Sequence, residues 1–198
     1  MVISKKQLGL IRDFSYRRVE KNDKFHQKFH IDQTVKLSIV LAKKEKVDVQ
    51  KSIAIAYLHD IAKFKQTKTI NHSNQGAIDS EIFLREIGLK QQEILDICYA
   101  IKEHNKDGQK GTKEAEIIYD ADKLQAIGAY GIFRCLSYNL DIVHCNKNQD
   151  ELFLETLKEI EFFQSSLYTK TGKKMAKKSK VFIKRFAKDY CEIRDAKI

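Results

Sequence analysis

The sequence predicts an all-α protein that folds as a single-domain helical bundle. Apolar residues recur at helical spacing along most of the chain, and no segment shows the alternation that is typical of a β-strand. The 198 residues contain no proline, and a chain of this length buries a core without disulfide or metal staples. The predicted helices cover residues 3–20, 31–44, 49–64, 74–87, 91–104, 113–127, 128–143, 150–167 and 173–194.

Local signals support individual helices. Ser4 is followed three residues later by Gln7, which is the spacing of a capping box at a helix start. The fourth helix closes on Gly88, a residue suited to a left-handed C-terminal cap. The apolar run Ile53–Leu58 covers all sides of a helix, so we expect the third helix to lie centrally in the bundle and to end on His59-Asp60.

The charge balance favours anionic ligands. The chain has 37 basic and 27 acidic residues and a formal net charge of +10, which suits phosphates, nucleotides, nucleic acid or an anionic membrane. Part of this charge lies near the C-terminus, where we interpret it as the solvated face of an amphipathic helix rather than a nucleic-acid or membrane surface. The basic residues of that segment are Lys170, Lys173, Lys174, Lys177, Lys178, Lys180, Lys184, Arg185 and Lys188.

Cysteine spacing and hydropathy point to the cytoplasm. The four cysteines show no CxxC spacing, and the chain opens without the apolar run of a signal peptide. The longest near-continuous apolar stretch, Ile53–Leu58, is far shorter than the roughly 20 residues that a membrane helix needs. We therefore expect a cytoplasmic protein with no membrane span.

Histidines and aspartates are the best candidates for chemistry. The His59-Asp60 pair ends an apolar helix, where burying both groups unpaired is costly and a bound cation would remove that cost. With His30 and Asp122 the pair forms a mixed nitrogen and oxygen set suited to Mn²⁺, Fe²⁺, Co²⁺ or Mg²⁺, and less to structural zinc. Singly, His30 could be a helix-start residue, Asp60 a satisfied polar group and Asp122 a partner of Lys123.

The ordered set resembles the HD-domain superfamily of metal-dependent phosphohydrolases, in its single-domain bacterial type. The resemblance implies that His30, His59, Asp60 and Asp122 are the metal ligands and that residues 1–198 form one HD-type helical domain. Its motif core spans about 25–135, and the C-terminal helices complete the bundle. The segments that carry the resemblance are 30–37, 56–63, 71–77, 100–104 and 120–129, with a later one at 168–176.

The resemblance implies a phosphohydrolase that acts on a nucleotide or a related phosphoester or phosphoanhydride. Water would be activated by a divalent metal (Mn, Mg, Co, Ni or Fe). Residues 120–134 are similar to nucleoside triphosphate pyrophosphohydrolases, whereas residues 59–63 with His72 and His104 are similar to dinuclear members, including dinucleoside polyphosphate hydrolases and phosphodiesterases. The chain lacks the Glu-Asp pair of alarmone hydrolases and the Gly-Tyr-Pro element of cyclic-dinucleotide phosphodiesterases.

Further residues receive roles on this interpretation. Asp60 and Lys63 are the expected catalytic residues, and Lys63 would also bind phosphate. The other expected substrate-binding residues are His72, His104, Lys123 and Arg134. Each has an alternative: Lys63 could be a solvated lysine, Arg134 a salt-bridge partner, and the two histidines ligands of a second metal or capping residues. Asp120 could orient a ligand. Because the run after Asp120 resembles single-metal members, we expect one metal.

Two other classes of function stay open at this point. A nucleic-acid-binding helical bundle would explain the net charge but not a buried helix that ends in His-Asp. A non-catalytic nucleotide sensor would keep the pocket without turnover. The sequence favours a small phosphorylated substrate as the partner, makes nucleic acid the less favoured one, and leaves the oligomeric state open.

Overall fold

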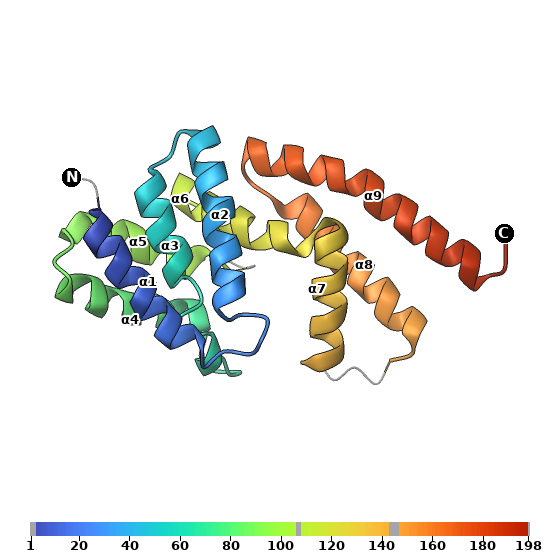
Figure 1. Cartoon of the computed structure of the whole chain (residues 1–198), viewed down its shortest axis with the longest axis horizontal. Helices are drawn as coiled ribbons and strands as arrows, with labels where there is room; N and C mark the ends of the chain where they lie inside the picture. Colours follow the sequence, from blue (N-terminus) through green and yellow to red (C-terminus); the bar gives the residue numbers. More distant parts are fainter. Residues whose placement is uncertain (1–2, 106–107, 143–146, 198) are drawn as a thin grey trace. The chain divides into compact units, whose positions relative to one another are not determined.

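A computed structural model describes residues 3–105, 108–142 and 147–197, and within these residues the protein is all-α (Figure 1). The described residues form nine α-helices and two short 3₁₀-helices, and they contain no strand, so the predicted fold class is confirmed. The elements are α1 (Lys5–Val19), α2 (Lys28–Glu45), α3 (Val49–Leu58), η1 (Lys63–Lys65), α4 (His72–Glu86), α5 (Gln91–Glu103), α6 (Lys113–Lys123), η2 (Leu124–Ala126), α7 (Gly128–Asp141), α8 (Gln149–Ser166) and α9 (Lys170–Arg194).

The chain divides into two compact units. The first is Met1–Ala121 and the second is Asp122–Ile198, so the boundary falls inside α6. The sequence predicted one domain over the whole chain, and that both units belong to one domain stays a prediction.

The first unit is built around α3. This helix packs against α1, α2 and α5, and α4 packs against α5. Ile55 and Leu58 of α3 are fully buried, as are Ile97 and Ile101 of α5. Burial of each such side chain contributes about 1.5–3 kcal/mol to the stability of the folded state. The prediction that the apolar helix lies centrally is therefore confirmed for this unit.

The end of α3 is earlier than the predicted range of 49–64 and agrees with the predicted end on His59-Asp60. The helix ends at Leu58 with His59 as its C-terminal cap, and tight turns follow. The amide of Lys63 donates to the carbonyl of Asp60 at 3.1 Å, and the amide of Lys65 donates to the carbonyl of Ala62 at 2.9 Å. Adjacent residues diverge by about 100° on a continuous helix. Beyond the helix end, Nε2 of His59 lies 3.4 Å from Oδ2 of Asp60.

Caps at helix ends match the sequence signals. Ser4 and Gln7 form the predicted capping box on α1, and Gly88 follows α4 with a φ of 73°. Helix α9 begins at Lys170, three residues earlier than predicted, because the Thr169 hydroxyl accepts a hydrogen bond from the Gly172 amide at 2.9 Å. These caps satisfy backbone groups that a helix end leaves without partners.

The second unit consists of α7, α8 and α9 packed pairwise, with η2 against all three. The ring of Phe153 on α8 stacks on Tyr190 of α9 with centroids 3.6 Å apart. Buried aliphatic side chains complete this core, among them Ile132, Leu152, Ile160 and Ile183. Across both units, none of the described helices combines the length and the apolar composition needed to cross a membrane.

The described cysteines are free thiols. Cys98, Cys135 and Cys191 form no disulfide, and Cys145 lies outside the described residues. Burial raises the pKa of the Cys98 and Cys135 thiols to about 12. Both side chains therefore act as small apolar groups at neutral pH rather than as nucleophiles.

Two glycines of the first unit give opposite predictions on substitution by alanine. Gly9 lies inside α1 and Gly88 at a positive φ after α4, and at both positions an added methyl group meets no atom within 4 Å. Gly9→Ala should stabilise the protein by about 0.5–1 kcal/mol because alanine favours a helix interior. Gly88→Ala should destabilise it by about 1 kcal/mol because alanine resists the left-handed conformation. Urea unfolding followed by circular dichroism measures the change in unfolding free energy for each variant. Changes of the same sign in the two variants would contradict these backbone assignments.

Candidate metal centre

A buried aspartate lies between four histidines. Asp60 is 4% exposed. Its Oδ2 atom lies 3.6 Å from Nε2 of His30 and 3.4 Å from Nε2 of His59. Its Oδ1 atom lies 3.4 Å from Nε2 of His72 and 3.6 Å from Nε2 of His104. Each carboxylate oxygen therefore faces its own pair of imidazoles.

All four histidines come from helix ends. His30 lies in the first turn of α2, and His72 is the first residue of α4. His59 and His104 are the C-terminal caps of α3 and α5. Close packing of α4 on the turn after α3 helps this convergence, because a methyl group at Gly76 would lie only 3.6 Å from the His59 carbonyl oxygen.

Hydrogen bonds fix the tautomer of three of the rings. Nδ1 of His59 donates to the Ala56 carbonyl at 2.8 Å, and Nδ1 of His104 donates to the Ile101 carbonyl at 2.6 Å. Nδ1 of His72 donates at 2.6 Å to Oε1 of Gln66, which also accepts the His72 amide. Because a carbonyl oxygen only accepts, the proton of a neutral ring lies on Nδ1, and the Nε2 lone pair faces the centre, where it can bind a metal.

Burial sets the charge of this centre. Burial lowers the pKa of His104 to about 4, so its ring is neutral at neutral pH. Burial alone would raise the pKa of Asp60, but the neighbouring His59 and the surrounding rings of His104, His30 and His72 hold it well below its usual range. An ionised carboxylate thus faces imidazole lone pairs in a water-poor space, where acceptors repel one another.

Divalent cations fit this donor set. A cation between each carboxylate oxygen and its histidine pair would turn the repulsion between acceptors into coordination. Neutral imidazole nitrogens with a carboxylate oxygen are the donors that Mn²⁺, Fe²⁺ and Co²⁺ accept. A carbonyl that accepts a hydrogen bond from Nδ1 is a usual orienting group of a metal-binding histidine.

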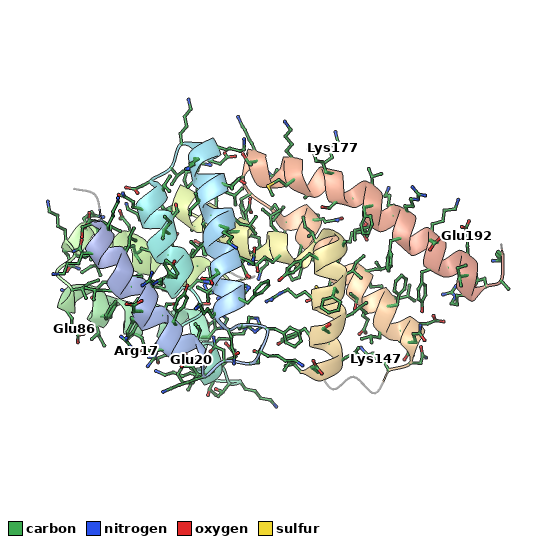
Figure 2. The ribbon with its side chains drawn as sticks, in the orientation of Figure 1. Arg17, Glu20, Glu86, Lys147, Lys177 and Glu192 are labelled. Carbon is green, nitrogen blue, oxygen red and sulfur yellow. The ribbon has the colours of Figure 1, made fainter. Side chains whose placement is uncertain are left out.

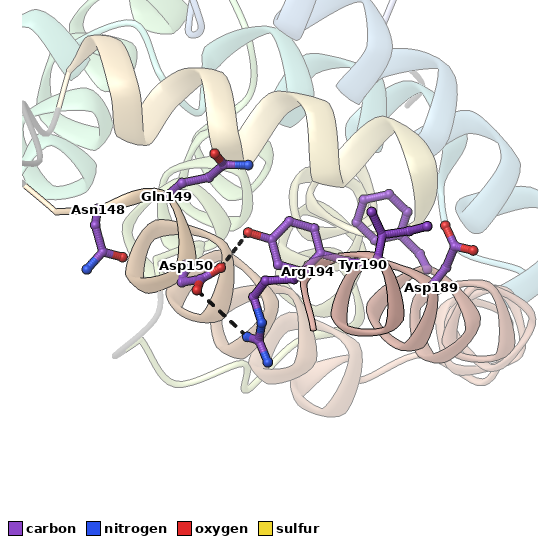
Figure 3. Close-up of a pocket in the computed structure, with 8 residues that line it drawn as sticks. Asn148, Gln149, Asp150, Asp189, Tyr190 and Arg194 are labelled. Carbon is purple, nitrogen blue, oxygen red and sulfur yellow. Dashed lines mark hydrogen bonds and ion pairs between the residues drawn. The ribbon is translucent and has the colours of Figure 1, made fainter. Parts of the chain in front are cut away.

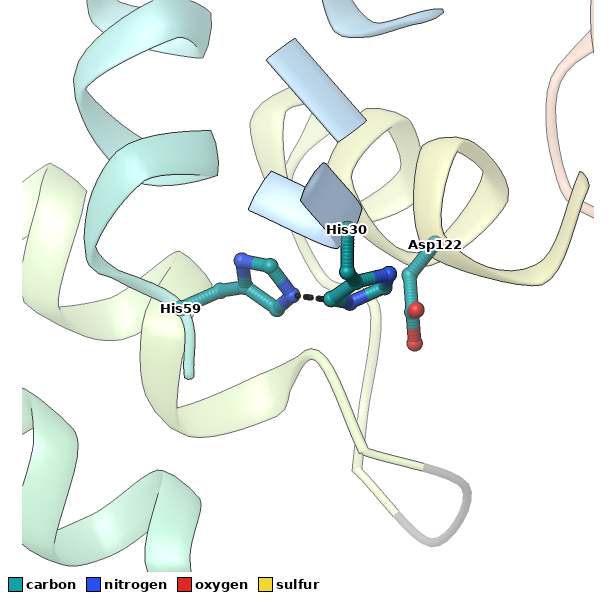
Figure 4. A group of neighbouring side chains, drawn as sticks. All are labelled: His30, His59 and Asp122. Atoms are coloured by element: carbon teal, nitrogen blue, oxygen red, sulfur yellow. Dashed lines mark hydrogen bonds between the residues drawn. The ribbon is translucent and has the colours of Figure 1, made fainter. Parts of the chain in front are cut away.

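Two groups of side chains could each hold an ion. One group is Asp60, His72 and His104, and the other is His30, His59 and Asp122. Within each group the ligand atoms all lie within 4.8 Å of one another. We call His30, His59 and Asp122, drawn in Figure 4, the first group, and Asp60, His72 and His104 the second group. Asp122 lies on α6 and directly follows Ala121, the last residue of the first unit.

The remaining sequence-predicted residues lie as follows. Lys63 begins η1, shortly after the His59-Asp60 turn. Burial would raise the pKa of Asp23, but the hydrogen bond with His26 and, to a smaller extent, the charge of Lys63 hold that pKa below its usual value. Lys123 forms an ion pair with Asp122 at 2.7 Å, the pairing that the sequence offered as the alternative to metal binding. Arg134 is a half-buried residue of α7 in the second unit, and Asp120 is fully buried on α6.

The structure adds Asn22, a positioning residue that the sequence analysis missed. Its amide group donates to the carbonyls of Asp60 at 3.0 Å and His26 at 2.9 Å, and its Oδ1 atom accepts the Phe64 amide at 2.8 Å. It thereby ties the loop before α2 to the turn that carries Asp60. Like Gln66, it lies between helices, where apolar periodicity gives no signal.

A separate pocket of 610 Å³ lies in the second unit, between the start of α8 and the last turns of α9 (Figure 3). Asp150 accepts a hydrogen bond from the Tyr190 hydroxyl at 2.7 Å and pairs with Arg194 at 3.9 Å. Its principal polar groups thus pair with one another. None of the residues that line it belongs to either donor group.

Comparison with known proteins identifies the family. The sequence pattern of the HD domain matches residues 29–127, which is half of the chain and contains all four predicted ligands. The chain therefore belongs to the HD-domain family. A search of curated proteins found no match.

Solved structures share the fold. A Lactobacillus plantarum protein matches with a TM-score of 0.79 and 21% identity, over 98% of this chain and 100% of that one. An HD-superfamily hydrolase from Bacillus thuringiensis matches with a TM-score of 0.75 and 19% identity, over 97% and 98% of the two chains. Bacillus subtilis YpgQ in complex with ADP matches with a TM-score of 0.74 and 19% identity, over 93% and 96%.

Asn22→Asp tests the positioning role of Asn22. The new carboxylate would face the carbonyl oxygens of His26 and Asp60, so two donated hydrogen bonds are lost and a charge is buried. We expect a loss of about 3 kcal/mol in unfolding free energy and weaker binding of Mn²⁺. The exposed Asn74→Asp is the matched control and should stay within about 0.5 kcal/mol of the parent. Calorimetry of Mn²⁺ binding and urea unfolding measure the two effects, and equal behaviour of the two variants would remove Asn22 from the centre.

Proposed function

We propose that this protein is a metal-dependent phosphohydrolase that acts on a nucleotide phosphoanhydride or phosphoester. The observation that carries the proposal is the ionised Asp60 carboxylate, with one oxygen toward His30 and His59 and the other toward His72 and His104. Membership of the HD-domain family supports it.

Asp60 and the histidines would hold the metal, with Asp122 as a further ligand. A divalent metal in this centre supplies Lewis acidity, which activates water at neutral pH and polarises a phosphoryl oxygen. The protein's own contribution is orientation. The Ala56 and Ile101 carbonyls hold the His59 and His104 rings with Nε2 inward, so that little reorganisation is needed when a ligand binds.

We further propose two metals rather than the one expected from the sequence. The reason is the second donor group, in which His72 and His104 face the Oδ1 atom of Asp60 while His30 and His59 face Oδ2. Asp60 would then serve as a ligand in both groups. This arrangement favours the dinuclear alternative and, with it, a dinucleoside polyphosphate over a nucleoside triphosphate.

Cationic side chains would bind the phosphates. Lys63 follows Asp60 by three residues and would neutralise charge that develops on the phosphoryl oxygens. Lys123 and Arg134 remain proposed phosphate contacts, and Lys123 would have to share its ammonium group with Asp122. YpgQ, which shares the fold, is known in complex with ADP, and this supports a nucleotide as the ligand class.

Metal content tests the nuclearity. Protein saturated with Mn²⁺ and freed of excess metal should contain about two equivalents per chain by elemental analysis, one for each donor group. His104→Ala should retain about one, because only the second group loses a ligand. The control Lys102→Ala changes an exposed residue of the same helix and should keep both. A single equivalent in the parent protein would contradict the dinuclear proposal.

Product analysis tests the activity and the substrate class. With Mn²⁺, a dinucleoside tetraphosphate should yield two nucleoside diphosphates, whereas a nucleoside triphosphate cleaved to pyrophosphate and a monophosphate would favour the mononuclear alternative. Asp60→Asn should lower turnover at least about 10³-fold, since it removes the charge that both metals share. Lys102→Ala should retain full turnover. Tight nucleotide binding with no product from any substrate would instead identify a sensor.

A further inference from the structure

The net charge of the protein is concentrated on one face of α9. Nine basic residues lie between Lys170 and Lys188, and all nine are exposed. No aspartate or glutamate occurs between Glu161 and Asp189. Without these nine residues the chain has 28 basic and 27 acidic residues, so the rest of the protein is nearly neutral.

Most of these nine side chains form no ion pair with the described acidic residues. Lys188 lies 3.4 Å from Glu192, and it is the only one of the nine with an acidic partner within ion-pair distance among the described residues. Figure 2 shows Lys177 projecting outward from α9. The opposite side of the helix packs on its own unit through the buried Ala176 and Ile183. We call the exposed side, from Lys170 to Lys188, the basic face of α9.

The basic face is long, and basic residues occur along its whole length. Eighteen helical steps span about 27 Å, and over that length a nucleic-acid duplex carries about 16 phosphates, of which one side presents about half. Eight cations with no acidic partner thus match the phosphates that can face them. Binding between such cations and phosphates is driven by the release of counterions and does not depend on base sequence.

The composition of the face disfavours a membrane. Helices that bind in a membrane interface bury an apolar face, but the apolar side of α9 is packed in the second unit, where Phe153 of α8 contacts Phe186 and Tyr190. Among the described residues from Lys170 to Lys188, the exposed large apolar side chains are Val181 and Phe182, which are too few to form the apolar face of a membrane-bound helix. Phe182 is the single exposed aromatic ring among them, whereas successive bases of a single strand stack on several rings.

We propose that the basic face of α9 binds the phosphate backbone of a double-stranded nucleic acid without reading its sequence. The exposure of all nine cations agrees with the solvated helical face expected from sequence, and the near-neutrality of the rest of the chain is the observation that favours an anionic partner for that face. The surface belongs to the second unit, and the proposal does not depend on the metal centre.

Fluorescence anisotropy with the full chain tests this proposal, using duplex DNA and duplex RNA of about 20 base pairs at several salt concentrations. We expect both duplexes to bind, with log affinity falling linearly with log salt. The triple variant Lys173→Gln, Lys177→Gln, Lys184→Gln should bind about tenfold or more weakly and reduce the salt slope by about 2–3. Binding of one duplex type alone would overturn the proposed backbone recognition.

The matched control removes three exposed lysines of the first unit, Lys43→Gln, Lys44→Gln, Lys102→Gln. It should keep the parent salt slope and most of the affinity. Equal losses in the two triple variants, or no binding by the parent protein, would overturn the proposal. Vesicles with about 30% anionic lipid form a further arm, and binding to them that exceeds duplex binding at the same salt would assign the face to a membrane instead. All substituted side chains are exposed, and circular dichroism checks that helicity is unchanged.

Discussion

A buried ionised carboxylate must be compensated on both oxygens, and the first unit of this protein is arranged around that requirement at Asp60. Four helix ends deliver four imidazoles to the two oxygens. A neutral ring that donates to a carbonyl through Nδ1, as the rings of His59, His72 and His104 do, has no proton on Nε2 to offer to Asp60. Hydrogen bonds from these neutral rings therefore cannot compensate the carboxylate, whereas a divalent cation could.

Contacts around the centre hold Asp60 and the histidines in place. Beyond the end of α3 at Leu58, His59 and Asp60 lie close together, and Asn22 ties the turn that carries them to the loop that precedes His30. Asp79 stabilises the neighbouring segment, since it accepts hydrogen bonds from Gln75 at 2.7 Å and Lys65 at 2.9 Å and pairs with Arg18. A metal bound at Asp60 would therefore stabilise contacts between several helices of this unit.

Most of the helices could be predicted because they obey local rules. Apolar periodicity located all nine, and the Ser4 and Gly88 signals gave correct ends. The predicted range of α3 extended too far, to residue 64, because the apolar residues continue through Ile61 and Ala62, and both are fully buried. The convergence of His30, His59 and Asp60 was anticipated through the family resemblance. Asn22 and Gln66 act through tertiary hydrogen bonds, for which residue spacing carries no information.

The central claim is that Asp60 bridges two metals, and diffraction with anomalous scattering at the manganese edge tests it most directly. Crystals grown with Mn²⁺ should show two anomalous peaks about 3.5–4 Å apart. One should lie among His72, His104 and Oδ1 of Asp60, and the other among His30, His59, Asp122 and Oδ2 of Asp60. A single peak with His72 and His104 turned away from it would contradict the account.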